Sequence, residues 1–501
     1  MKSTLLAYIA LSLIMQTCVP AGSASHPTSA VGWRALADSC VAGRRFTQAA
    51  DDYLRAADIY TRTGDSGAAE ILRDDAMRYS TDVRLFMECP ARYVDLRSLY
   101  TRRRLEPVYG AYIGAFIDRE DGVGGRFLDE NGQIHKDCAA FEAAIGRKHT
   151  DYFMYMRYGN RFPTEWTENL RRDGAAAQLV LSPDNLDEVK DNNYLRGLAE
   201  AAGRSGIPIF LRFAGEMNGD WVPYHGDPQR YIQAFRLVAD VFHSIADNVA
   251  MVWCVNDVPQ DQIARYYPGA DAVDWVGVNF YSVPYNNGSI AQPAQWRNPA
   301  DNLQYVYKLY AARHPIMIGE YAASHLCKVD MRPVPDFAID KIGQLYSSLP
   351  RLYPRVKAVH WLSMDTLKYA MPERQLNNYS LLADHRVAEQ YREMISDPYF
   401  LTSVYPNQAP MAYHAICALR NGAVMSGIVK ISAWVRSYEE RPKVVYYVAG
   451  KPASSFTIPG AYEWSLDTRE LRNGPIELKV AAFDSRNQLA GCQTVHAIIR
   501  N

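Results

Sequence analysis

The sequence predicts an α/β protein built on a (β/α)8 TIM barrel, with an N-terminal helical segment and a C-terminal immunoglobulin-like β-sandwich. Three observations predict this architecture. Between about residues 106 and 400, eight short apolar runs alternate with amphipathic helical stretches. Such runs are typical of parallel strands that helices cover on both faces. Before this region apolar residues recur at helical spacing, and after it they follow the pattern of short strands separated by turns.

The first 24 residues predict a signal peptide. Lys2 supplies a positive end, Leu5 to Met15 an apolar stretch, and Gly22 to Ala24 a small-residue cleavage site. We therefore expect a secreted protein, extracellular or periplasmic. No later segment reaches about 18 consecutive apolar residues, so we expect no membrane span.

Residues 25–95 predict helices. Trp33, Leu36, Ala37 and Cys40 recur at helical spacing, and "FTQAADDYLRAADIYTRTGD" resembles one tetratricopeptide helix. A stacked solenoid needs about three repeats, and barely more than one is present. We expect a small helical cap or a segment that docks a partner.

The eight apolar runs predict a barrel over residues 100–405. Helical stretches between them carry one apolar stripe, as in "YIQAFRLVADVFHSIA". Eight strand–helix units in roughly 300 residues fit a closed barrel better than a doubly wound sheet. The runs cover residues 108–117, 150–159, 176–183, 208–216, 249–256, 273–281, 315–322 and 356–364.

The last region, residues 415–501, follows a Pro-containing linker at 396–410 and predicts only strands. Short strands at this spacing, separated by Gly, Pro and Asn turns, favour an immunoglobulin-like sandwich. Cys417 and Cys492 lie near its two ends and form a candidate disulfide. A spacer role and a sugar-binding role fit this region equally well.

The composition argues against several classes of function. The formal net charge is −1 over 501 residues, so no basic surplus is available for nucleic acid. The 11 histidines are scattered, and no H-E-x-x-H motif, glycine-rich phosphate loop or dinucleotide fingerprint is evident. We therefore expect no metal and no cofactor. The 12% aromatic content fits either a large core or a groove that stacks sugar rings.

Two glutamates follow apolar runs at the edge where barrel enzymes place their chemistry. Glu216 comes just after the fourth run and Glu320 lies at the end of the seventh. A facing pair of carboxyl groups suits glycosidic hydrolysis, since one must donate a proton and the other must be ionised. A negative Glu320 would disfavour ionisation of Glu216 and so keep it an acid. The alternative is that each glutamate merely caps a strand-to-helix loop.

The segments "FLRFAGEMNGDWVPY", "YYPGADAVDWVGVNFYS" and "PIMIGEYAAS" resemble those of glycoside hydrolase family 26, the β-mannanase family of clan A. The resemblance spans roughly residues 106–400. It implies a retaining double displacement with Glu216 as acid/base and Glu320 as nucleophile. It also implies that Tyr281 hydrogen-bonds the nucleophile, that Trp361 forms the floor beneath the reacting sugar, and that Trp221 forms an aromatic wall.

Four further polar residues lie close to these motifs. The resemblance suggests that Arg212 supports the carboxylates, and a structural salt bridge fits equally well. Asn218 and Asn256 are candidate sugar contacts, whereas His225 fits a surface loop. The family usually has a histidine immediately before the acid/base, where this chain has Gly215, which leaves mannan specificity open.

We therefore expect a secreted retaining β-glycoside hydrolase, mannanase-like, that acts on a polysaccharide. The alternative is a carbohydrate-binding or envelope protein that keeps the barrel and has lost turnover. Replacing Glu320 with alanine should abolish hydrolysis and leave folding and oligosaccharide binding largely intact. The sequence specifies neither the β-glycan nor endo versus exo action.

Overall fold

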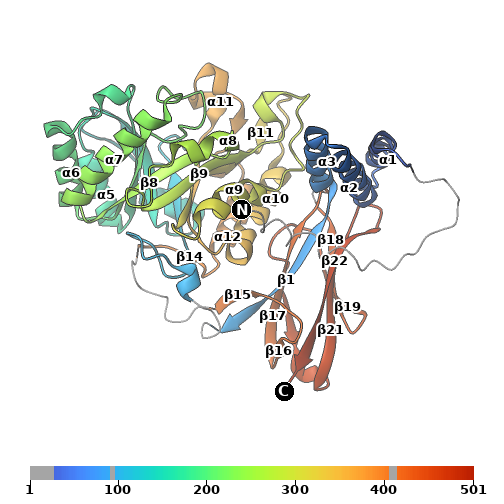
Figure 1. The fold of residues 1–501 in the computed structure, drawn as a ribbon. Helices are drawn as coiled ribbons and strands as arrows, with labels where there is room; N and C mark the ends of the chain where they lie inside the picture. Colours follow the sequence, from blue (N-terminus) through green and yellow to red (C-terminus); the bar gives the residue numbers. More distant parts are fainter. Residues whose placement is uncertain (1–26, 91–95, 405–413, 440) are drawn as a thin grey trace. The chain divides into compact units, whose positions relative to one another are not determined.

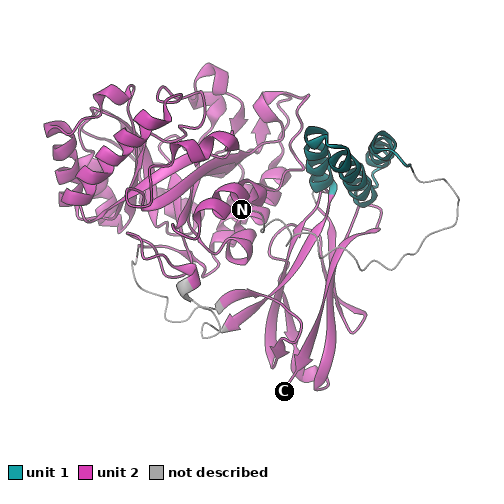
Figure 2. Cartoon of the chain, viewed as in Figure 1, with its two compact units in different colours: residues 1–79 teal, residues 80–501 magenta. Residues whose placement is uncertain are grey.

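The computed structural model describes residues 27–90, 96–404, 414–439 and 441–501, so the expected signal peptide lies outside the described residues. The chain forms two compact units, residues 1–79 and residues 80–501 (Figure 2). The first unit contains helices α1 (Ala30–Ala42), α2 (Phe46–Thr63) and α3 (Ser66–Tyr79). Gly64, with φ 87°, ends α2 because a left-handed residue cannot continue a helix.

The second unit contains a closed barrel of eight parallel strands (Figure 1). Each strand pairs with the next along the chain, and β12 pairs with β2 to close the ring. All eight apolar runs form barrel strands, so the predicted fold class is confirmed. The strands are β2 (Ala111–Phe116), β5 (Asp151–Arg157), β6 (Ala176–Ser182), β7 (Ile209–Phe213), β8 (Val249–Asn256), β9 (Trp275–Ser282), β10 (Ile316–Ala323) and β12 (Val356–Leu362).

Large side chains fill the lower interior of the barrel. Tyr112, Phe210, Trp275 and Met317 project inward and are fully buried. Because successive side chains of a strand face opposite ways, residues two positions further along each strand also point inward, closer to the carboxyl end. The lower interior is therefore a packed core, and a cavity can open only at the upper rim.

Amphipathic helices cover the outside of the barrel (Figure 1). In α7, Asp227 caps the N-terminus by accepting from the Arg230 amide, Pro228 occupies the first turn, and Phe235 and Phe242 pack inward. The helices of this unit are α4 (Cys138–Ile145), α5 (Thr164–Asp173), α6 (Asn193–Ser205), α7 (Pro228–Ile245), α8 (Gln260–Ile263), α9 (Gln304–Tyr310), α10 (Pro335–Leu352), α11 (Thr366–Tyr369) and α12 (His385–Ile395). Of the helices in the described part of the chain, none combines the length and apolar character that a bilayer crossing needs.

Short elements lie in the connections around the barrel. The small strands are β3 (Arg126–Leu128), β4 (Ile134–Lys136), β11 (Leu326–Cys327), β13 (Asn377–Asn378) and β14 (Phe400–Leu401). The 3-10 helices are η2 (Leu96–Leu99), η3 (Leu186–Glu188), η4 (Ala264–Tyr266), η5 (Asn286–Gly288), η6 (Pro299–Leu303), η7 (Pro372–Arg374), η8 (Leu381–Ala383) and η9 (Thr468–Glu470).

The C-terminal strands form two sheets that share one apolar core. One sheet has the order β15 (His414–Ala418), β1 (Asp82–Pro90), β17 (Ile428–Arg436), β20 (Trp464–Asp467). The other has the order β16 (Val424–Met425), β22 (Leu489–Ile499), β21 (Gly474–Phe483), β18 (Lys443–Val448), β19 (Lys451–Phe456). Strands packed in two layers agree with a sandwich, and the immunoglobulin-like assignment stays a prediction.

Strand β1 corrects the expected boundary of the helical segment. Residues 82–90 were assigned to that segment, but they form a central strand of the first sheet. Val83 and Leu85 alternate into the shared core, which is a two-residue period that helical spacing does not produce. Cys417 and Cys492 lie on different sheets, and each of the seven cysteines among the described residues is a free thiol.

Candidate active site

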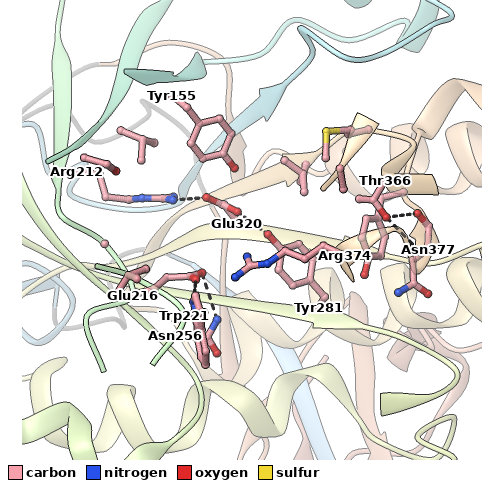
Figure 3. A pocket seen from close by; sticks show the side chains of 18 of the residues that line it. Tyr155, Arg212, Glu216, Trp221, Asn256, Tyr281, Glu320, Thr366, Arg374 and Asn377 are labelled. Atoms are coloured by element: carbon pink, nitrogen blue, oxygen red, sulfur yellow. Dashed lines mark hydrogen bonds and ion pairs between the residues drawn. The ribbon is translucent and has the colours of Figure 1, made fainter. Parts of the chain in front are cut away.

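A cavity of about 600 Å³ opens where the carboxyl ends of the barrel strands meet. Its walls come from seven of the eight strands and from the loops that follow β7 and β12. Figure 3 shows the side chains of Glu216 and Glu320 among those that line it. The lining residues are Tyr155, Val180, Ser182, Arg212, Gly215, Glu216, Trp221, Val222, Tyr224, Asn256, Tyr281, Glu320, Leu362, Met364, Thr366, Ala370, Arg374, Leu376, Asn377 and Tyr379. The two glutamates that the sequence singled out therefore lie in one cavity.

A bulge in β10 aims Glu320 into the barrel. The pairing with β9 shifts between Ile318, which lies opposite Val278, and Glu320, which lies opposite Asn279. Gly319 occupies the shifted position, where a β-carbon would lie 2.7 Å from Asn279 Oδ1. A bulge places one extra residue in a strand and turns the next side chain to the other face. The glycine therefore allows the bulge, and the bulge places the carboxylate in the cavity.

Two donors hold the Glu320 carboxylate. The Arg212 guanidinium forms an ion pair with Oε1, and the Tyr281 hydroxyl donates to Oε2 at 2.5 Å. Arg212 lies on the inward face of β7 and is 3% exposed. The structure thus brings together the three residues that the resemblance grouped, and Arg212 forms its ion pair with a candidate catalytic residue.

Burial and charge act in opposite directions on Arg212. Removal from water would lower the pKa of its guanidinium, but the adjacent Glu320 carboxylate raises this pKa well above the usual value. For Tyr281, burial and the negative charge of Glu320 both raise the pKa of the phenol. Both side chains therefore keep their protons at neutral pH and remain donors to Glu320.

Glu216 follows β7 on an unusual backbone. Ala214 has φ 45° and Glu216 has φ 62°, a left-handed region that non-glycine residues rarely adopt. The Glu216 amide donates to the Cys254 carbonyl at 2.8 Å, and its carbonyl accepts from Gly219 at 3.0 Å. Such backbone strain costs about 1–3 kcal/mol and persists where surrounding contacts fix it, often at functional sites.

Three neutral donors surround the Glu216 carboxylate. The side-chain amides of Asn279 and Asn256 donate to Oε1 at 2.7 and 3.2 Å. The indole N–H of Trp221 donates to Oε2 at 2.7 Å. Glu216 therefore has uncharged partners only, whereas Glu320 has a cationic one.

Trp221 forms part of the cavity wall, as the resemblance implies. Its side chain is 37% exposed, so one face of the indole is open to a ligand. Gly219 makes room for the ring, since a β-carbon there would lie 2.3 Å from the indole. An exposed indole beside two carboxylates provides a flat surface on which a sugar ring can stack.

Trp361 lies outside the cavity, contrary to the expectation that it forms the sugar floor. It is fully buried, and its ring contacts Tyr321 and Tyr391 in the layer between barrel and helices. Strand alternation explains the difference, because Leu362 next to it faces inward and lines the cavity. The Trp361 indole N–H donates to the carbonyl of Tyr379, a cavity residue, at 3.0 Å.

Asn218 also lies outside the cavity lining, so the expectation of a sugar contact is corrected. Its side-chain amide donates to the carbonyls of Asn256 and Pro259, and its oxygen accepts from the Asn256 amide. These bonds join the loop after β7 to the end of β8 and so position Asn256. His225 is exposed and lies outside the cavity lining, as expected for a surface loop.

Several residues of the site escaped the sequence interpretation. Asn279 could have been found, because it lies two positions before Tyr281 on the same strand and so shares its inward face. Tyr155, Tyr379 and Arg374 come from runs and loops that carry no recognisable motif, and only the folded chain brings them to the site. Within the described ranges, no group of histidine, cysteine, aspartate and glutamate side chains could hold a metal ion.

Comparison with known proteins supports this interpretation of the motifs. Residues 166–301 match the family model described as Glycosyl hydrolase family 26, and the expected resemblance is confirmed there. Beta-1,3-xylanase TXYA of Vibrio sp is 31% identical over 118 residues, which are 22% of this chain and 25% of that protein. Endoglucanase H of Acetivibrio thermocellus is 24% identical over 300 residues, which are 54% of this chain and 31% of that protein.

The chain thus spans less than a third of the length of these two curated relatives. Among solved structures, the catalytic domain of the Bacillus sp. JAMB-750 GH26 Endo-beta-1,4-mannanase is similar at 14% identity and a TM-score of 0.44. That alignment covers 62% of this chain and 92% of the other.

Proposed function

We propose that this chain is a secreted glycoside hydrolase of family 26 that cleaves a β-linked polysaccharide by a retaining double displacement. One observation carries the proposal. Two carboxylates open into a single cavity of about 600 Å³, one paired with a buried cation and the other held by neutral donors. Glycosidic hydrolysis by either a retaining or an inverting course needs this asymmetry, because one carboxyl group must be ionised while the other carries a proton; the retaining course is what the resemblance to family 26 implies.

Glu320 is the nucleophile in this proposal. Arg212 compensates the negative charge of its carboxylate, and Tyr281 donates to the second oxygen. Glu320 attacks the anomeric carbon as the glycosidic bond breaks, which forms a covalent glycosyl ester. Because the ester is neutral, the negative charge next to Glu216 disappears at this step.

Glu216 is the acid and then the base. Asn279 and Asn256 both donate to Oε1, whereas Oε2 accepts, among the described residues, only from the Trp221 indole, which is partly exposed. Oε2 is therefore the oxygen that serves the leaving group. It protonates the departing glycosidic oxygen in the first step. In the second step it takes a proton from water, whose oxygen attacks the anomeric carbon and releases Glu320.

The substrate class rests on the comparisons as well as on the cavity. The matched family is one of glycosyl hydrolases, and the curated relatives reported above are a β-1,3-xylanase and an endoglucanase. A β-linked polysaccharide is what these activities share. Gly215 lines the cavity where the family usually carries a histidine, so the mannan-type specificity is the part of the proposal that most needs a direct assay.

The test is an activity panel with matched variants. Wild type, Glu320→Ala, Glu216→Ala and the exposed control Asp220→Ala are assayed on mannan, xylan, mixed-linkage glucan and β-1,3-glucan. We expect wild type and the control to release reducing sugar and both active-site variants to lose at least about 10³-fold in kcat. On an aryl β-glycoside whose leaving group departs without a general acid, azide should restore turnover to Glu216→Ala and yield a β-glycosyl azide, because a small anion needs no general base. Equal and negligible release by all four proteins would favour a carbohydrate-binding role instead.

A further inference from the structure

A second arginine reaches the cavity besides the one that pairs with Glu320. Arg374 belongs to η7 and lines the cavity, and Figure 3 shows its guanidinium extending toward the side where Glu216 and Glu320 lie. Its side chain is exposed, and no carboxylate of the described residues lies within ion-pair distance of it. Arg374 is therefore a cation that is free to meet a ligand.

The loop that carries Arg374 is ordered by its own hydrogen bonds. The Leu376 amide donates to the Arg374 carbonyl at 2.9 Å, and the Lys328 amide donates to the Leu376 carbonyl at 2.9 Å. Asn377 begins β13, which pairs with β11, and its amide donates to Thr366 Oγ1 at 3.2 Å. The Arg374 amide also donates to the Met371 carbonyl at 2.8 Å, so the backbone is hydrogen-bonded on both sides, and a cation on such a backbone loses less conformational freedom when it binds a ligand.

The charges that line the cavity show what this cation does. Four of the lining side chains can carry a full charge near neutral pH: Arg212, Glu216, Glu320 and Arg374. Arg212 and Glu320 neutralise each other as an ion pair. When Glu216 carries the proton that it must donate, the sum is one positive charge, and Arg374 bears it.

A lone cation opposes the proposed reaction on a neutral sugar. The transition state of glycoside hydrolysis develops positive charge on the ring, and like charges in a partly desolvated cavity repel. A carboxylate on the substrate would remove this conflict. The planar guanidinium of arginine binds a planar carboxylate through two parallel hydrogen bonds, which adds orientation as well as attraction.

We propose that the glycan cleaved in this cavity is anionic, with a uronic-acid carboxylate bound by the guanidinium of Arg374. This inference rests on the proposed function, because it names the substrate class of the same site. Arg374 is then a specificity-determining residue that distinguishes a sugar carrying a carboxylate at C6 from one carrying a hydroxymethyl group.

Matched oligosaccharides test the inference. Pairs of β-1,4-gluco-, β-1,4-manno- and β-1,3-gluco-oligosaccharides, identical except for a hydroxymethyl or carboxylate group at C6, are assayed with wild type, Arg374→Gln and the exposed control Arg265→Gln. We expect wild type to prefer the carboxylate member of the pair that it cleaves. Arg374→Gln should reduce kcat/KM on that member about 10- to 100-fold, since hydrogen bonds to charged groups are of that strength. It should not lower kcat/KM on the neutral member, because removing the cation relieves its repulsion of the positive transition state, and Arg265→Gln should match wild type on both.

Two results would overturn the inference. One is a wild type that cleaves the neutral member as well as the charged one. The other is an Arg374→Gln variant that weakens activity on both members equally. If no pair is cleaved by any protein, the polysaccharide panel decides the proposed function, and calorimetry with the carboxylate oligosaccharides decides the binding inference alone. An at least tenfold weaker Kd for Arg374→Gln would support it, and equal Kd values would refute it.

Discussion

Removing Glu320 should weaken the fold as well as the activity, which revises the expectation from the sequence that folding stays largely intact. Arg212 is 3% exposed, and among the described residues its one side-chain hydrogen bond goes to Glu320, while Nε and Nη1 have no partner. Glu320→Ala would leave this guanidinium buried without a counter-charge. Breaking a buried ion pair from one side costs about 3–5 kcal/mol, and we expect the free energy of unfolding to fall by about that amount.

The assay is urea unfolding of wild type, Glu320→Ala, Glu216→Ala and the double variant Arg212→Met/Glu320→Ala, followed by fluorescence. Glu216→Ala is the matched control, because it removes a carboxylate whose partners are all neutral, and it should cost about 1–2 kcal/mol. The double variant removes the stranded charge and should be more stable than Glu320→Ala. If Glu320→Ala unfolds within about 1 kcal/mol of wild type, or if the double variant gains nothing, the ion pair does not stabilise the barrel in the way described.

Three further predictions address stability and the corrected residues. Lys357 is buried, and burial lowers the pKa of its ammonium group from 10.5 to about 7. Between these two pH values the unfolded chain binds more protons than the folded one, so the free energy of unfolding rises with pH. Lys357→Met should therefore raise the free energy of unfolding by about 4–5 kcal/mol at pH 6 and by less than about 1 kcal/mol at pH 10; an equal gain at both pH values would contradict the reasoning. Gly319→Ala should lower the melting temperature and the activity, because its β-carbon would lie 2.7 Å from Asn279 Oδ1. Gly215→Ala is the control: its β-carbon would lie 3.4 Å from Arg212 Nε, so it should melt like wild type in a calorimetric scan. Trp361→Phe should cost about 2 kcal/mol of stability and change kcat/KM less than about threefold; a loss of two orders of magnitude would return the indole to the sugar site.

The linear pattern of the chain was sufficient for the barrel and for its two glutamates. Apolar runs long enough for strands buried on both faces recur eight times, and this repetition is a property of the chain itself. Glu216 and Glu320 each follow such a run, and the carboxyl ends of parallel strands meet at one rim. Their placement at the same rim of the barrel therefore follows from topology.

The direction of individual side chains was decided only by the folded barrel. Trp361 and Leu362 are neighbours, and which of them faces the cavity depends on the register of β12 against β10 and β2. Glu320 faces inward because of a bulge, which arises from the pairing with β9 and from the space around Gly319. Register is a relation between strands, so neither residue could be oriented from the sequence near it.

Distant partners were also beyond the linear pattern. Strand β1 precedes the barrel and pairs with β15 and β17 that follow it, because its alternating apolar residues are buried only between two sheets. Arg374 reaches the cavity from a loop that no motif marks. The sequence determined which segments are strands and where the two acids stand on them. The tertiary structure decided which charges face each other, since Coulombic contacts depend on distances that only packing fixes.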